Sequence, residues 1–324
     1  MDRRAFLRLT GLTSIGLLIQ SDSSWAQNWP QHPVKIIVPI GPGSTSDICA
    51  RTFADKLSAI WQQPVVVENR PGGDAIVGIM AMISANDDHT LLLTGSAVFT
   101  PHPYVHEKLP YDAKRDIVPV AGICELSGGI AVPQSLNVDT LTQLVSMVRK
   151  EPGKLNWGAI ASLDDFIFSA FLKSEGLIMT RVPYRDPISA LNDLSEARID
   201  VCIAALSGLL PRVQSGKVKV LAIINPRRSP AAPELSTATE AGYSSLTYAP
   251  ILGIFGSRAL TAEARARIAA DLKTVTEDSS VVSRLAPIGL EVKFFAPAAF
   301  TETIEQERAK IAAIAKMLDI RPAQ

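Results

Sequence analysis

The stretch Val34-Lys-Ile-Ile-Val38, continued by Pro39-Ile-Gly-Pro-Gly-Ser-Thr-Ser-Asp47, indicates the fold class of this chain. The β-branched run at 34–38 predicts a buried strand. The glycines allow a tight turn, and Ser44 or Ser46 is placed to cap a helix. Apolar residues then recur at helical spacing: Ile48, Phe53, Leu57, Ile60 and Trp61. A strand that enters a helix through a short turn is the repeating unit of parallel α/β layers.

The same alternation continues along the chain. Further strands are expected at 65–68, 90–93, 155–157, 181–182, 199–203, 218–224 and 251–255. Helices are expected to about residue 84 and at 139–150, 164–176, 188–197, 262–275 and 297–318. The segment 117–132 reads as two extended pieces broken by Ser127-Gly128-Gly129. The pattern predicts an α/β protein with two lobes, a ligand cleft between them, and crossing strands near 118–132 and 246–255.

The first 26 residues have the features of an export signal. Arg3-Arg4 precede Phe6-Leu7, an apolar run follows, and Ser24-Trp25-Ala26 form a small-x-small cleavage site. The arginine pair resembles a twin-arginine signal. The apolar run is too short to span a membrane, which needs about 20 residues. The alternative is a short amphipathic helix of a cytosolic protein. We therefore expect a signal peptide at 1–26 and a working location in the periplasm. From the strand and helix pattern we expect a first lobe at 27–122, completed by 251–324, and a second lobe at 123–250.

Charge and cysteine content exclude several classes of protein. The chain balances 32 basic against 32 acidic residues, so it offers no electrostatic basis for binding nucleic acid or an acidic membrane surface. Cys49, Cys124 and Cys202 lie far apart in apolar segments, without a C-x-x-C motif. We expect them to be small buried hydrophobic residues, with one disulfide and a leftover thiol as the alternative.

The loop at 39–47 is the strongest candidate binding element. Its backbone amides and the helix dipole favour an anion, so a carboxylate could be oriented without Lys or Arg. An ordinary capped turn is the alternative. A dinucleotide site is disfavoured because position 46 is Ser rather than Gly, and a P-loop is excluded because no Lys follows.

Catalytic machinery is sparse. No G-x-S-x-G motif is present. His102 and His106 are four residues apart, but the prolines flanking His102 favour a loop over a metal-binding helix. Asp164-Asp165 could act as an acid/base pair, although their place at a helix start favours a capping role. We expect no catalytic residues, no metal and no cofactor.

Several ordered strings resemble one family. They include Pro64-Val-Val-Val-Glu68-Asn69-Arg70-Pro71-Gly72, Asp87-x-His89-Thr90-Leu91-Leu92, Leu109-Pro110-Tyr111-Asp112, Pro152-Gly153-Lys154-Leu155-Asn156 and Val182-Pro183-Tyr184-Arg185. Together with 38–47, they are similar to the substrate-binding proteins of tripartite tricarboxylate transporters, the Bug receptors. The similarity runs in order through the chain after residue 26.

The resemblance implies a periplasmic-binding-protein type II fold and a monomeric receptor that passes a small organic ligand to membrane permease subunits. It also implies ligand contacts in both lobes. In the first lobe these are Ile40, Gly43, Ser44, Thr45, Ser46, Asp47, Gly95, Ser96, Ala97 and Val98. In the second lobe they are Ala159, Ile160, Ser162, Asp164, Tyr184, Asp186, Ala204 and Ala205.

The chain departs from the family pattern at several of these positions. Ile160 and Leu163 stand in a loop where relatives have small residues, Asp186-Pro187 replace a glycine and a small residue, and Asp74-Ala75 replace glycines. Asp164, Asp165 and Asp186 add negative charge, and like charges 4 Å apart repel by about 4 kcal/mol at an effective dielectric of 20. We therefore expect a monocarboxylate, an amino-acid-like zwitterion or an aromatic acid rather than a tricarboxylate. The alternative is that these carboxylates face solvent or cap helices.

Two other functions stay open at this stage. A receptor that reports its ligand to a signalling partner would have the same pocket and a different docking surface. An exported hydrolytic enzyme would need Asp164 or Asp165 for turnover.

Overall fold

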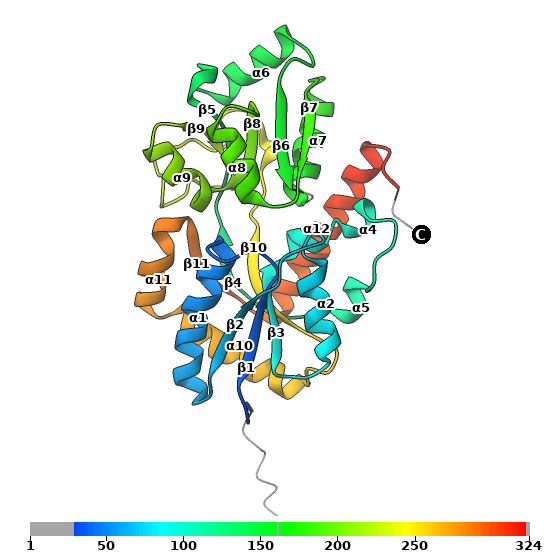
Figure 1. Ribbon diagram of the computed structural model, residues 1–324, viewed down its shortest axis with the longest axis vertical. Helices are drawn as coiled ribbons and strands as arrows, with labels where there is room; N and C mark the ends of the chain where they lie inside the picture. Colours follow the sequence, from blue (N-terminus) through cyan, green and yellow to red (C-terminus); the bar gives the residue numbers. More distant parts are fainter. Residues whose placement is uncertain (1–28, 161, 322–324) are drawn as a thin grey trace, which may run out of the picture.

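The structure, a computed structural model, describes residues 29–160 and 162–321, and two mixed β-sheets form its framework (Figure 1). The export signal expected at 1–26 lies outside the described residues. The helices and sheets confirm the predicted alternating α/β architecture.

The first sheet has the strand order β11-β4-β10-β3-β1-β2. Strand β1 lies between β2 and β3 and is parallel to both, whereas β10 is antiparallel to β3 and β4. The strand bounds are β1 Val34–Val38, β2 Val65–Asn69, β3 Thr90–Gly95, β4 Val118–Leu126, β10 Ile251–Gly256 and β11 Leu290–Phe295.

The second sheet has the order β7-β6-β8-β5-β9. Strand β6 is parallel to β7 and β8, while β5 is antiparallel to β8 and β9. The bounds are β5 Gly128–Pro133, β6 Asn156–Ile160, β7 Thr180–Tyr184, β8 Val201–Ala205 and β9 Val218–Ile223.

Helices cover both sheets (Figure 1). Those that pack mainly with the first sheet are α1 Thr45–Trp61, α2 Ile76–Ala85, α10 Ala262–Thr276 and α11 Ser279–Leu285. Those of the second are α6 Leu141–Lys150, α7 Leu163–Ser174, α8 Pro187–Ser195 and α9 Leu206–Gln214. Short helices are α3 Ser96–Phe99, α4 His102–Val105 and α5 Ala113–Asp116, with 3₁₀ turns at Gln134–Leu136, Ser244–Leu246 and Ala286–Ile288.

The last helix, α12 Pro297–Met317, packs with both halves of the molecule. Phe300 and Ile304 belong to the core of the first sheet, where the ring of Phe300 lies against Phe255. Ile311, Ile314 and Ala315 belong to the core of the second sheet. The helix therefore ties the two halves together along one side (Figure 1).

The chain crosses from the first sheet to the second at Ser127, which alone separates β4 from β5. The side chain of Asn225 braces this crossing, because it donates to the carbonyl of Leu126 and accepts from the amide of Gly128. The chain returns between β9 and β10. The predicted break at 127–129 is thus shorter than expected, since Gly128 and Gly129 are paired in β5.

Three of the longer elements were missed by the sequence pattern: α9, α11 and β11. Helix α9 contains Pro211, and only Leu206 and Leu209 of its residues are buried, so its apolar pattern is short. Strand β11 is an edge strand that pairs only with β4 in the described sheet, and its burial is incomplete. Edge strands carry a weak alternating signal because they contact one neighbour.

Candidate functional site

The loop before α1 is built around the side chain of Asp47. Gly43, at φ 78°, donates its amide to Asp47 Oδ2 at 2.9 Å, and Ser44 Oγ caps the helix by accepting from the Asp47 amide. Burial raises the pKa of Asp47, but hydrogen bonds from Arg51 and Gly43 outweigh it, so the pKa lies below its ordinary value. Asp47 is therefore an ionised residue that shapes the loop from within, while Ile40, Thr45 and the buried Ser46 flank it.

The loop after β3 is tied to α12. Ser96 is fully buried and donates its hydroxyl to Glu307 Oε2 at 2.5 Å. Burial raises the pKa of Glu307 to about 7, against the opposing effect of the Ser96 hydrogen bond. Gly95 and Ala97 are buried and Val98 is half-buried. The expected contact residue Ser96 thus has its hydroxyl committed to a neighbouring carboxylate.

In the second half, the turn into α7 holds Asp164 against the crossing segment. Tyr248 donates its hydroxyl to Asp164 Oδ1 at 2.6 Å. Burial raises the pKa of Asp164 to about 6, and the neighbouring charge of Asp165 adds to the shift. A cavity of only about 10 Å³ adjoins this carboxylate, enough for one water at most. Ala159 is buried, Ile160 is half-buried, and the buried Ser162 Oγ has no hydrogen-bond partner in the described part of the chain.

The other two expected acidic side chains are engaged locally. Asp165 is buried and pairs with Arg181, which donates its Nε–H to Asp165 Oδ1 at 2.8 Å. Asp186 caps α8 by accepting from the amide and hydroxyl of Ser189. Of the open alternatives, the structure therefore favours pairing and capping for these two carboxylates over free negative charge in a cleft.

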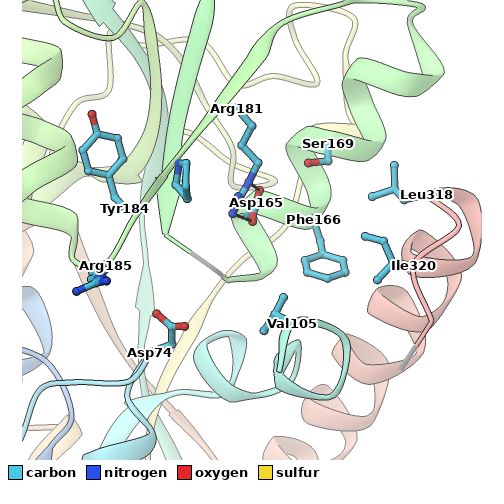
Figure 2. A pocket seen from close by; sticks show the side chains of 11 residues that line it. Asp74, Val105, Asp165, Phe166, Ser169, Arg181, Tyr184, Arg185, Leu318 and Ile320 are labelled. Carbon is cyan, nitrogen blue, oxygen red and sulfur yellow. Dashed lines mark hydrogen bonds and ion pairs between the residues drawn. The ribbon is translucent and has the colours of Figure 1, made fainter. Parts of the chain in front are cut away.

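Tyr184 and the end of β8 complete the expected set. Tyr184 donates to Asp193 Oδ2 at 2.7 Å, and its hydroxyl points away from the other labelled side chains in Figure 2. Ala204 and Ala205 are half-buried at the end of β8, where Ala205 precedes α9.

One contact brings the two halves together directly. The hydroxyls of Thr45, in the first turn of α1, and Ser207, in the first turn of α9, form a hydrogen bond. The side chain of Thr45 thus contacts the second half of the molecule. Ser207 was missed because its helix was missed, and the pair is separated by 162 positions in sequence.

A pocket of about 720 Å³ opens between the two halves on the β7 side (Figure 2). We call it the side pocket. It is lined by Asp74, Val105, Asp165, Phe166, Ser169, Arg181, Pro183, Tyr184, Arg185, Leu318 and Ile320. Tyr184 is the member of this set that was expected as a ligand contact, and Asp74, Asp165, Pro183 and Arg185 lie in segments that the sequence singled out. The segments that meet at the pocket, around positions 74, 105, 165–169, 181–185 and 318–320, are far apart in the chain, and no local pattern links them.

A single turn, α4, brings the rings of His102 and His106 to 5.1 Å. His102 is fully buried beside Tyr111 Oη, 2.6 Å from its Nδ1, and burial lowers the pKa of His102 to about 4. His106 Nε2 lies 3.4 Å from Asp74. Across residues 29–160 and 162–321, no group of three or more His, Cys, Asp or Glu side chains could hold a metal ion.

The three cysteines are buried, free thiols, with the Sγ atoms of Cys49 and Cys124 3.7 Å apart. Within the described ranges, no helix combines the length and apolar character needed to cross a bilayer.

Two mixed α/β halves joined by crossing segments, with a pocket between them, define the class of two-lobe solute-binding proteins. Within that class, residues 49–320 match the family model described as tripartite tricarboxylate transporter family receptor, and the chain belongs to this family. The family expected from the ordered motifs is thereby confirmed.

Similar proteins agree with this assignment. The chain is 28% identical over 282 residues to a UPF0065 protein of Bordetella bronchiseptica, covering 86% of this chain and 84% of that protein. It is 29% identical over 237 residues to the protein BugT of Bordetella pertussis, covering 72% and 73%.

Two solved structures share the fold. The R. palustris protein Rpa4515, solved with adipate, superposes with a TM-score of 0.81 at 26% identity, covering 91% of this chain and 99% of that one. The periplasmic binding protein BugD superposes with a TM-score of 0.81 at 21% identity, covering 90% and 99%. The predicted two-lobe periplasmic-binding-protein fold is confirmed.

Proposed function

We propose that this protein is a periplasmic receptor that captures a small organic acid between its lobes and delivers it to the permease of a tripartite tricarboxylate-type transporter. The observation that carries the proposal is the Thr45–Ser207 hydrogen bond, because it sets the loop before α1 at the junction of the two lobes. Family membership supports the transport role. Adipate bound to a relative that is 26% identical supports a small carboxylate as ligand.

The loop residues expected to bind the ligand belong to this proposal. Backbone amides at the start of α1, a helix of 17 residues, would receive a carboxylate. The buried Ser162 hydroxyl would supply a donor from the second lobe. The boundaries 27–122, 123–250 and 251–324 are the proposed division into lobes, and the protein is proposed to act as a monomer.

A ligand with one carboxylate, an amino-acid-like zwitterion or an aromatic acid fits the charges better than a tricarboxylate. Arg181 is neutralised by Asp165, so the side pocket supplies one further cation, Arg185. A tricarboxylate would place three negative charges near this single cation and near Asp74. Uncompensated charge of this kind is costly in a partly desolvated site.

A thermal-shift screen tests the proposal, with protein expressed from its full reading frame and purified from the periplasmic fraction. Adipate, monocarboxylates, aromatic acids, amino acids and citrate are the probes. A ligand at 100 times its dissociation constant should stabilise the protein by about 2.7 kcal/mol. Absence of the protein from the periplasm, or stabilisation by citrate alone, would contradict the proposal.

Loop variants locate the binding. Ser162→Ala should lower the affinity for the ligand found in the screen. Ser146→Ala, on the exposed face of α6, should leave that affinity unchanged. Two other functions differ in readout. A sensing receptor would bind the same ligand without supporting uptake in a deletion strain. An exported hydrolase would turn over its substrate and lose that turnover in Asp164→Ala or Asp165→Ala.

A further inference from the structure

The side pocket has a charged end and an apolar end. In Figure 2, Asp74 and Arg185 lie together at one end, and Phe166, Val105, Leu318 and Ile320 gather at the other. The volume of about 720 Å³ is in the range of small-molecule sites, roughly 300–1,000 Å³. Such a pocket suits a molecule that is itself polar at one end and apolar at the other.

Two charged side chains of the pocket, Arg185 and Asp74, are available to bind a ligand. Asp165 and Arg181 neutralise each other through the ion pair described above. Arg185 is exposed and forms no ion pair within the described part of the chain. The Asp74 carboxylate lies 3.4 Å from His106 Nε2 and forms no ion pair with Arg185 in the described part of the chain. A cation and an anion therefore face the same end of the pocket without bonding to each other.

Asp74 is held in this place by an unusual backbone. Asp74 and Ala75 have φ values of 51° and 75°, in the left-handed region that favours glycine. Strained non-glycine residues persist where the surrounding structure or a function requires them. Ala75 is buried at the start of α2 and Asp74 is half-buried above it, so the turn presents the Asp74 carboxylate to the pocket (Figure 2).

The apolar end comes from both lobes. Phe166 of α7 is buried, Val105 at the end of α4 is 38% exposed, and Leu318 and Ile320 follow α12 and are half-buried. An exposed valine that faces a buried phenylalanine gains free energy when an apolar group covers it. A ligand seated here would contact both lobes and would therefore favour their closed arrangement.

We propose that the side pocket binds a free amino acid with an apolar side chain. The ligand carboxylate pairs with Arg185, its ammonium group pairs with Asp74, and its side chain lies against Val105, Phe166 and Ile320. Arg185 suits a carboxylate because its guanidinium offers paired donors. The inference rests on the proposed receptor function and deepens it, because it names the residues of the side pocket that would recognise the two charged groups and the apolar side chain of the ligand.

Calorimetry with four probes tests each part of the inference: L-phenylalanine, 3-phenylpropionate, which lacks the ammonium group, phenethylamine, which lacks the carboxylate, and glycine, which lacks the side chain. L-phenylalanine should bind the wild-type protein about tenfold more tightly than any of the other three. If 3-phenylpropionate binds as tightly as L-phenylalanine, Asp74 does not recognise an ammonium group and the proposal is overturned.

Variants assign the contacts. Arg185→Gln should lower the affinity for L-phenylalanine and for 3-phenylpropionate by about tenfold. Asp74→Asn should lower the affinity for L-phenylalanine alone. Asparagine tolerates the left-handed conformation of position 74, so this variant keeps the turn. Val105→Ser should lower the affinity for every probe that carries a phenyl ring. Lys154→Gln, which removes an exposed cation outside the pocket, is the control and should change nothing.

The outcomes separate this inference from the receptor function. Unchanged L-phenylalanine affinity in both Arg185→Gln and Asp74→Asn overturns the side-pocket site. The inference also fails if none of the four probes binds wild-type protein at about 5 mM and none of them changes its melting temperature. If adipate or another acid still binds in that case and is weakened by Ser162→Ala, the proposed receptor function stands while the side-pocket inference fails.

Discussion

The hydroxyl of Tyr248, in the segment that returns to the first lobe, donates a 2.6 Å hydrogen bond to the carboxylate of Asp164 at the start of α7. Lys310 of α12 lies over the Tyr248 ring, 5.7 Å from its centre, and donates to the carbonyl of Thr247. One turn before Lys310, Glu307 accepts from Ser96. Polar groups that are buried or half-buried therefore lie between the two expected binding loops.

Tyr248→Phe should destabilise the protein by about 1–3 kcal/mol, because Asp164 loses its donor inside the fold. Since burial already raises the pKa of Asp164 to about 6, the loss should be larger at pH 8, where the carboxylate is ionised, than at pH 5. Urea denaturation of the wild type and the variant at both pH values measures this loss of unfolding free energy. Tyr243→Phe, at a half-buried tyrosine of the same region, is the control, and an equal effect of both variants would contradict the role given to Asp164.

Glu307 should make the stability fall as pH rises. Its pKa in the folded protein is about 7, above the ordinary value of 4.5, so the folded state binds a proton that the unfolded state has released between these values. This contribution to the free energy of unfolding, on the order of 3 kcal/mol, is complete below about pH 4.5 and is lost as pH rises through 7.

Glu307→Gln should flatten this part of the pH–stability curve, as followed by denaturation midpoints from pH 4.5 to 8. Glu302→Gln, on the exposed face of the same helix, should retain the wild-type slope. A slope that survives Glu307→Gln would assign the titration to another group.

Gly253 permits the close approach of α12 to the first sheet. A Cβ atom at this position would lie 2.2 Å from the ring of Phe300 and 2.7 Å from the carbonyl oxygen of Ala121. Gly253→Ala should therefore cost about 1–3 kcal/mol of unfolding free energy by overpacking. Gly41→Ala, where nothing lies within 4 Å, should change stability little, and equal melting temperatures for both variants would refute the argument.

Thr45 and Ser207 should favour closure of the cleft. Removing either hydroxyl, in Thr45→Val or Ser207→Ala, deletes one hydrogen bond worth about 0.5–1.5 kcal/mol. Adipate binding, measured by calorimetry, should weaken by about two- to tenfold in each variant. The double variant should bind adipate as tightly as each single variant does. If the two losses of binding free energy add in the double variant, the two residues act separately.

Local sequence was sufficient to predict most elements of the framework. Strand β1 matches the expected 34–38, and α6 buries its regularly spaced Leu141, Leu144, Val145 and Val148. Such elements carry their own periodicity, because one face of each is buried along its whole length. Helix α9 and strand β11 escaped for the opposite reason, since each buries too little to give a clear pattern.

The binding loops could be named from the sequence through their family pattern, but their surroundings could not. Nothing local indicates that Asp165 meets Arg181, whereas the capping of α8 by Asp186 is a local contact that the sequence left open as an alternative. The expected ligand contacts stay a prediction.

The sequence by itself determined the alternation of strands and helices, the capped loop at the start of α1 and the family of the protein. The tertiary structure alone decided which distant groups meet: Thr45 with Ser207, 162 positions apart, and Asp164 with Tyr248, 84 positions apart. It also placed Asp74 and Arg185 in the lining of one pocket. The physical reason is the range of the interactions. Helix and strand periodicity arise between near neighbours in the chain, whereas a pocket between lobes depends on how completed elements pack.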